Sequence, residues 1–209
     1  MTLSYNQIAG RGLERIAVLS DGLFAIAMTL IVLEIRIPDP ASISSEQQLW
    51  GGIVGLAPRF VTYLLSFLTL GIFWSGQQTQ LNHLARADRN FAWINLAFLA
   101  AIAVMPFSTS LLAEFITYRL ALFVYWLNIF VVGLALYATW AYATRAGLLK
   151  DGTAPDVPRA ITRRIIVGQA LYACGALLSV VSTYWSIAFI VLVQLNFAVA
   201  PRVRWLSRI

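Results

Sequence analysis

The stretch from Arg15 to Pro38 constrains the fold more than any other part of the chain. It reads RIAVLSDGLFAIAMTLIVLEIRIP, which is long and apolar enough to cross a bilayer as one helix, because a crossing takes roughly 20 residues at about 1.5 Å each. Asp21 and Glu34 interrupt the apolar run, and a carboxylate left in hydrocarbon costs several kcal/mol. The segment must therefore face protein or water along part of its surface.

The composition of the whole chain is that of an integral membrane protein. Of its 209 residues, 60% are hydrophobic and 11% are charged, whereas a soluble domain carries about 25% charged residues. The single Cys174 permits no internal disulfide, and together with the single His83 it does not make a metal site. The net charge of +6 needs no nucleic-acid partner, because the basic residues lie between apolar segments as membrane topology requires.

Six apolar segments predict an all-α membrane protein in which one domain, residues 1–209, contains six transmembrane helices. We place these helices near residues 16–37, 53–76, 91–112, 119–143, 161–182 and 184–201. Of the 15 Lys and Arg residues, all lie on one side of the membrane in this arrangement except Arg36, Arg59 and Arg119. The positive-inside rule then predicts a multi-pass protein of the cell membrane with both termini in the cytoplasm.

Several functional classes lack support in the sequence. It contains no glycine-rich nucleotide-binding loop or Walker motif, and no serine, cysteine or histidine set for nucleophilic catalysis. We therefore expect neither an enzyme nor a resident cofactor.

The first segment has a bulky aliphatic stripe when it is drawn as a helix. At 100° per residue, six side chains lie within about 60° of one line, and Thr29 borders them: Leu19, Leu23, Ile26, Leu30, Leu33 and Ile37. Asp21 falls on roughly the opposite face, beside Phe24 and Ile31. The wheel thus predicts one aliphatic face and another face that buries the acid.

Each face has two interpretations. The aliphatic stripe either contacts lipid and neighbouring helices or, in an oligomer, forms rings that constrict a pore and gate it by dewetting. Asp21 is either a carboxylate held by hydrogen bonds from Ser20, an Arg or a polar residue on another helix, or part of a proton relay. The structural role is favoured, because the sequence offers no chain of other intramembrane acids.

One motif resembles a known family. Arg15 is followed, after three residues, by Leu19-Ser20-Asp21-Gly22, and the segment ends Leu33-Glu34-Ile35-Arg36-Ile37-Pro38. This pattern resembles the bacterial transmembrane protein 175 family of potassium channels, which usually has Phe at the position of Leu19. Phe73-Trp74-Ser75-Gly76-Gln77 is similar to the family's second helix, with Gln77 in place of its usual His. Asn95 and the run from Met105 to Thr109 also look familial, so the resemblance covers the first three helices.

The resemblance implies a homotetramer of six-helix subunits in a lipid bilayer, with the first helix lining a central K⁺ pore. The ring positions that form the constriction and select the ion would be Ile26, Leu30 and Leu33, with Thr29 beside them. A structural network would join Arg15, Ser20, Asp21, Trp74 and Asn95, with Leu19 and Gln77 changing its detail.

The predicted function is a potassium-permeable cation channel with modest K⁺ over Na⁺ selectivity. A narrow apolar neck selects by the ease with which an ion sheds water, and K⁺ holds its hydration shell less tightly than Na⁺. The alternative is a secondary transporter of a cation or small solute, which requires discontinuous helices around a midplane site. The Gly51–Gly55 spacing and Pro58 are weak hints of such a break.

Overall fold

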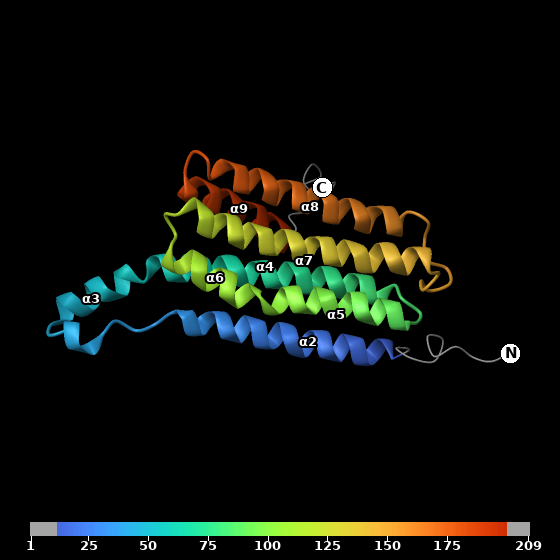
Figure 1. Cartoon of the computed structure of the whole chain (residues 1–209), viewed down its shortest axis with the longest axis horizontal. Coiled ribbons are helices and arrows are strands. Elements are labelled where there is room, and N and C mark those ends of the chain that lie inside the picture. Colours follow the sequence, from blue (N-terminus) through green and yellow to red (C-terminus); the bar gives the residue numbers. More distant parts are fainter. Residues whose placement is uncertain (1–11, 200–209) are drawn as a thin grey trace.

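Residues 12–199 are described by a computed structural model, in which long helices lie side by side along one direction (Figure 1). The elements in chain order are α2 (Leu13–Leu30), η1 (Ile31–Glu34), η2 (Pro40–Ser42), α3 (Glu46–Gly55), α4 (Ala57–Asn82), α5 (Arg89–Ala103), α6 (Met105–Glu114), α7 (Arg119–Arg145), α8 (Val157–Leu178) and α9 (Thr183–Val199). Within the described part of the chain, five helical stretches are long and apolar enough to cross a membrane, and α9 is apolar but shorter. The all-helical prediction is confirmed.

Two helix ends in the structure differ from the predicted ones. The first span ends as a 3-10 turn at Glu34, three residues short of the predicted end, because the chain must turn before Pro38 and Pro40. The second helix continues six residues past the predicted end, to Asn82. Its last turns are polar and escape a hydropathy window, although they still pack inside the bundle: Gln77, Gln80 and Leu81 are buried.

Two of the predicted spans are divided into consecutive helices. The predicted third helix is α5 followed by α6, separated at Val104, because Pro106 lacks the N–H that a continuous helix needs. Ahead of α4, the short α3 projects beyond the end of the bundle (Figure 1). Leu56 separates α3 from α4, and Pro58 lies in the first turn of α4.

The α2 helix lies at one side of the bundle and α8 at the other (Figure 1). The contacts of α2 are with α4, α5 and α6, whereas α8 packs on α7 and α9. At the end of α7 the chain leaves the helix through Gly147, whose φ of 64° is the left-handed conformation that favours glycine. A loop with a short bridge between Leu84 and Leu149 then leads to α8.

Buried polar side chains in the centre of the bundle are joined to one another across helices. Thr109 of α6 donates to Ser66 of α4 at 2.7 Å, and Ser66 donates to the Tyr125 hydroxyl of α7 at 3.2 Å. Thr69 lies 3.1 Å from the same hydroxyl and accepts from Gln194 of α9 at 2.6 Å. In hydrocarbon, unpaired polar groups are costly. This series of hydrogen bonds therefore fixes how the four helices α4, α6, α7 and α9 pack.

Candidate functional site

Most of the aliphatic stripe is exposed in the single chain, whereas Leu23 is half-buried and packs against the core. Ile26 is 60% exposed, Leu30 44% and Leu33 69%. Thr29 is also exposed, and its hydroxyl donates to the carbonyl oxygen of Ile26 at 2.8 Å. A stripe of this kind presents hydrocarbon, with no aligned carbonyl oxygens, to whatever lies in front of it.

The opposite side of the same helix packs into the bundle. Phe24, Ala27 and Ile31 are 2%, 3% and 0% exposed, and Ser20 is fully buried. Phe24 meets Phe98 of α5 with ring centroids 6.0 Å apart. One element thus carries a tightly packed face and an uncovered aliphatic face.

The predicted burial of Asp21 was wrong. The wheel placed this acid on the face opposite the aliphatic stripe and predicted that it is buried, but Ser20 is the buried residue, and Asp21 lies at the exposed edge of the packed face. A helical wheel gives angles between side chains of one helix, and only contacts with α4 and α5 decide which line faces the bundle.

Ser20 is held by amides from two neighbouring helices. Gln77 Nε2 of α4 lies 3.0 Å from Ser20 Oγ and 2.8 Å from Asn95 Oδ1 of α5, and it donates to both. Ser20 Oγ itself donates to the carbonyl oxygen of Ile16 at 2.8 Å. Gln77, the residue that departs from the family's usual His, therefore lies at the centre of this contact.

Asp21 is held by α4 alone. Its Oδ1 accepts from Trp74 Nε1 at 2.8 Å and from Gln78 Nε2 at 2.7 Å. Trp74 and Gln78 are four residues apart and so share one face of α4, a spacing from which Gln78 could have been predicted. The structure brings together four of the five predicted network residues, whereas Arg15 is exposed and is not part of these hydrogen bonds between described residues.

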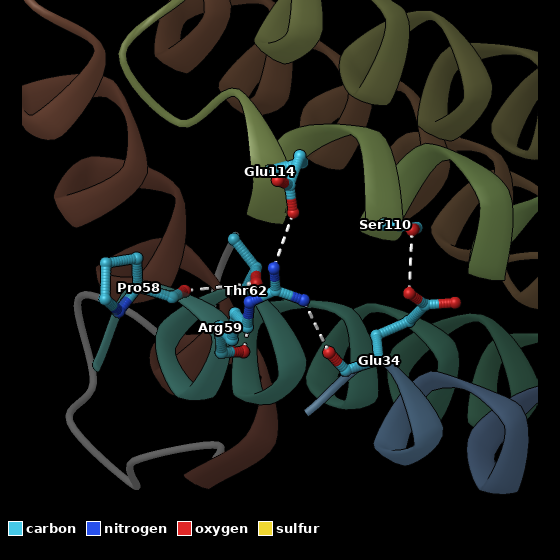
Figure 2. Close-up of polar contacts among 6 residues, drawn as sticks. All are labelled: Glu34, Pro58, Arg59, Thr62, Ser110 and Glu114. Atoms are coloured by element: carbon cyan, nitrogen blue, oxygen red, sulfur yellow. Dashed lines mark hydrogen bonds and ion pairs between the residues drawn. The ribbon is translucent and has the colours of Figure 1, made fainter. Parts of the chain in front are cut away.

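A second polar contact, which was not predicted, holds the other end of the first span (Figure 2). Arg59 of α4 donates from Nη1 to the backbone carbonyl oxygen of Glu34 at 3.0 Å, and its Nη2 pairs with Glu114 of α6 at 2.5 Å. The Glu34 carboxylate accepts from Ser110 of α6 at 2.8 Å. Glu34 ends η1, and its carbonyl oxygen accepts from the backbone N–H of Arg36 at 3.1 Å as well as from Arg59.

The first span is therefore attached to the rest of the chain at both ends. Ser20 and Asp21 attach one end to α4 and α5, and Glu34 attaches the other end to α4 and α6. The aliphatic stripe lies between these attachments and faces away from them. Such an arrangement holds an apolar surface at a fixed position without covering it, which suits a constriction made from several copies.

The chain is similar to known channel proteins. A family model described as the endosomal/lysosomal potassium channel TMEM175 matches residues 15–106. A potassium channel of Streptomyces collinus is 35% identical over 155 residues, which are 72% of this chain and 73% of that one. A potassium channel of Chamaesiphon minutus is 30% identical over 188 residues, or 88% and 92% of the two chains.

More distant relatives and a solved structure agree with these matches. The human endosomal/lysosomal proton channel TMEM175 is 32% identical over 98 residues, which are 19% of its length. The crystal structure of a lysosomal potassium-selective channel TMEM175 homolog from Chamaesiphon minutus matches with a TM-score of 0.77 at 28% identity. The match covers 91% of this chain and 98% of that one.

The shared bundle and these relatives define a membrane ion channel rather than an enzyme. The chain belongs to the TMEM175 family of potassium channels.

Proposed function

We propose that four copies of this chain assemble around a central pore that conducts K⁺ across the cell membrane, with both termini in the cytoplasm. The observation that carries the proposal is the uncovered stripe of Ile26, Leu30 and Leu33 on a helix whose other side is buried and attached at both ends. The bacterial relatives named potassium channels support the same function.

The proposed constriction selects by dehydration. Rings of aliphatic side chains leave no room for a full hydration shell and offer no oxygen cage, so an ion passes according to how readily it loses water. K⁺ loses its shell more easily than Na⁺, which gives modest selectivity. Thr29 donates its proton to Ile26, so the lone pairs of its hydroxyl oxygen remain free to meet a cation beside the neck.

A secondary transporter is the alternative, and the interruption between α5 and α6 is the feature that favours it, whereas the interruption between α3 and α4 lies where α3 projects beyond the end of the bundle (Figure 1). Transporters use the free carbonyls of broken helices to coordinate ions. Here, however, the Ala101 carbonyl ahead of the break accepts from Asn128 at 3.0 Å. This carbonyl is therefore already hydrogen-bonded inside the subunit and is not free to coordinate an ion. The channel is the better proposal.

Cation flux in proteoliposomes tests the proposal, with K⁺, Na⁺ and H⁺ measured separately because the vertebrate relatives are named proton channels. We expect K⁺ flux that exceeds Na⁺ flux and does not saturate. Ile26→Asn and Leu30→Ser should wet the neck, raise the flux about tenfold, equivalent to about 1.4 kcal/mol off the barrier, and reduce the preference for K⁺.

Leu192→Ser is the matched control, because Leu192 is 66% exposed on α9, and we expect it to leave flux unchanged. K⁺ flux no greater than that of empty vesicles would contradict the channel. Saturable flux coupled to a counter-ion would favour the transporter.

A further inference from the structure

A groove runs between α4, α8 and α9, away from the face of α4 that holds α2. Its deeper part is a cavity of about 90 Å³, and an adjoining outer part has a volume of about 240 Å³. The two parts are continuous, because both are lined by Ile72, Ser75, Arg164 and Phe197.

Arg164 lies at the mouth of this groove and forms no ion pair with a carboxylate of residues 12–199. Its guanidinium lies 5.5 Å from the centroid of the Phe197 ring. Arg159 and Arg163 are exposed on the same first turns of α8. The mouth of the groove is therefore strongly positive.

The outer part of the groove is apolar and suits an extended hydrocarbon chain. It follows α4 from Ser75 to Phe67 past Leu68 and Gly71, a length of about 12 Å at 1.5 Å per residue. A Cβ added at Gly71 would meet nothing within 4 Å, so the space beside this residue is open. Arg164 lies seven residues into α8, or about 10 Å from its end, a depth that suits a lipid headgroup.

We propose that this groove binds one anionic glycerophospholipid, with its phosphate on Arg164 and one acyl chain along Gly71 and Leu68. The phosphate would receive charge-assisted hydrogen bonds from the guanidinium. Basic pockets between transmembrane helices are known to hold anionic headgroups. The acyl chain would cover apolar surface that the subunit itself leaves open.

The site would act on the pore helix through α4. The groove residues Ser75 and Gly76 lie on α4 between Trp74 and Gln77, which hold Asp21 and Ser20 of α2. A lipid seated in the groove would stiffen the turns that fix the position of α2. This consequence for conduction rests on the proposed function, whereas binding of the lipid does not.

Native mass spectrometry of the purified full-length chain tests the binding. Detergent-solubilised protein is titrated with phosphatidylglycerol or with phosphatidylcholine of the same acyl chains. We expect one tightly bound phosphatidylglycerol per subunit and weaker binding of phosphatidylcholine. Arg164→Gln should weaken phosphatidylglycerol binding about tenfold, and Gly71→Phe, which fills the groove without changing charge, should do the same.

Arg163→Gln is the matched control, because Arg163 neighbours Arg164 in sequence but does not line the groove. Its binding should equal that of the unchanged chain. Equal losses in Arg163→Gln and Arg164→Gln would overturn the proposal in favour of diffuse surface charge, and undiminished binding to Gly71→Phe would overturn the placement of the acyl chain. Unfolding midpoints identify any variant that fails to fold. If either Arg164→Gln or Gly71→Phe fails to fold, the binding measured with the other one decides whether the groove holds the lipid. A chain that conducts no K⁺ could still pass this test.

Discussion

Asp21 shows how a carboxylate is accommodated in the first span of this channel. It lies at the edge of the packed face of α2, where a single oxygen, Oδ1, accepts from Trp74 Nε1 and Gln78 Nε2. Hydrogen bonds to a charged acceptor contribute about 1.5–3 kcal/mol each. The two donors on α4 therefore account for the acid as an attachment point, which supports the structural interpretation over the proton relay.

Substitutions of Asp21 should distinguish the contribution of its hydrogen-bond acceptor to stability from the contribution of its negative charge. Asp21→Ala leaves Trp74 and Gln78 without an acceptor, and we expect it to lower the stability of the folded chain in detergent by about 1–3 kcal/mol. Asp21→Asn keeps one carbonyl oxygen at the same position and should cost less than half as much. Thermal unfolding measures both. If Asp21→Asn lowers the stability as much as Asp21→Ala, the charge matters more than the oxygen. If the stability of Asp21→Asn is normal but its flux no longer responds to pH, the proton relay is supported.

At the scale of elements, α8 and α9 approach each other closely at Gly175. Gly175 is buried, and a Cβ added there would lie 2.6 Å from Cγ1 of Ile190 and 3.2 Å from Phe189. Its carbonyl oxygen accepts from Ser186 at 2.6 Å. Ile190 is itself buried and, as a β-branched residue, has little rotamer freedom with which to move aside. Glycine at this position lets the two helices touch, as small residues do in membrane bundles.

Gly175→Ala should therefore destabilise the chain by about 1–3 kcal/mol through overpacking. Gly168→Ala is the control on the same helix, because an added Cβ there meets its nearest atom, Cζ of Phe197, at an ordinary 3.8 Å. We expect the control to be neutral or to stabilise by up to about 1 kcal/mol, since alanine favours the helix over glycine. Thermal unfolding in detergent compares the two, and equal effects would contradict the tight α8–α9 contact.

The α2 element also depends on its second attachment, at Glu34. The ion pair of Arg59 with Glu114 is exposed at its acidic partner, whose side chain is 57% accessible, so it contributes at most about 1 kcal/mol. The bond from Arg59 to the Glu34 carbonyl matters more for position than for stability, because it fixes where η1 ends (Figure 2). Leu33 directly precedes Glu34, so the same bond also fixes the position of Leu33.

At the scale of the whole molecule, the proposed pore exists only in the oligomer. We expect a native mass four times the 23.1 kDa of one chain. In a Cys174→Ser background, Leu33→Cys should form disulfide-linked dimers on mild oxidation, because the stripe would meet its copies around the central axis. Leu192→Cys, also exposed, should not. A monomeric mass, or equal crosslinking of the two variants, would contradict the tetramer.

The site was predictable in part. Ser20, Asp21, Trp74 and Asn95 were named from a motif, and the structure brings them together. Gln78 was missed although it lies four residues after Trp74. Arg59, Ser110 and Glu114 were not predictable, because they lie far from Glu34 in sequence and belong to segments with ordinary compositions. Which residues form the constriction stays a prediction until the assembled channel is tested.

The sequence by itself determined the class of fold and the existence of an aliphatic stripe, because segment length, hydropathy and helical period are properties of the local chain. Only the tertiary structure decided how that stripe is presented. The buried line of α2 runs through Ser20 rather than Asp21 because amides and aromatic rings more than fifty residues away, on α4 and α5, pack against it. The helix that carries the acid is attached at both ends, and the aliphatic residues Ile26, Leu30 and Leu33 are what it leaves uncovered.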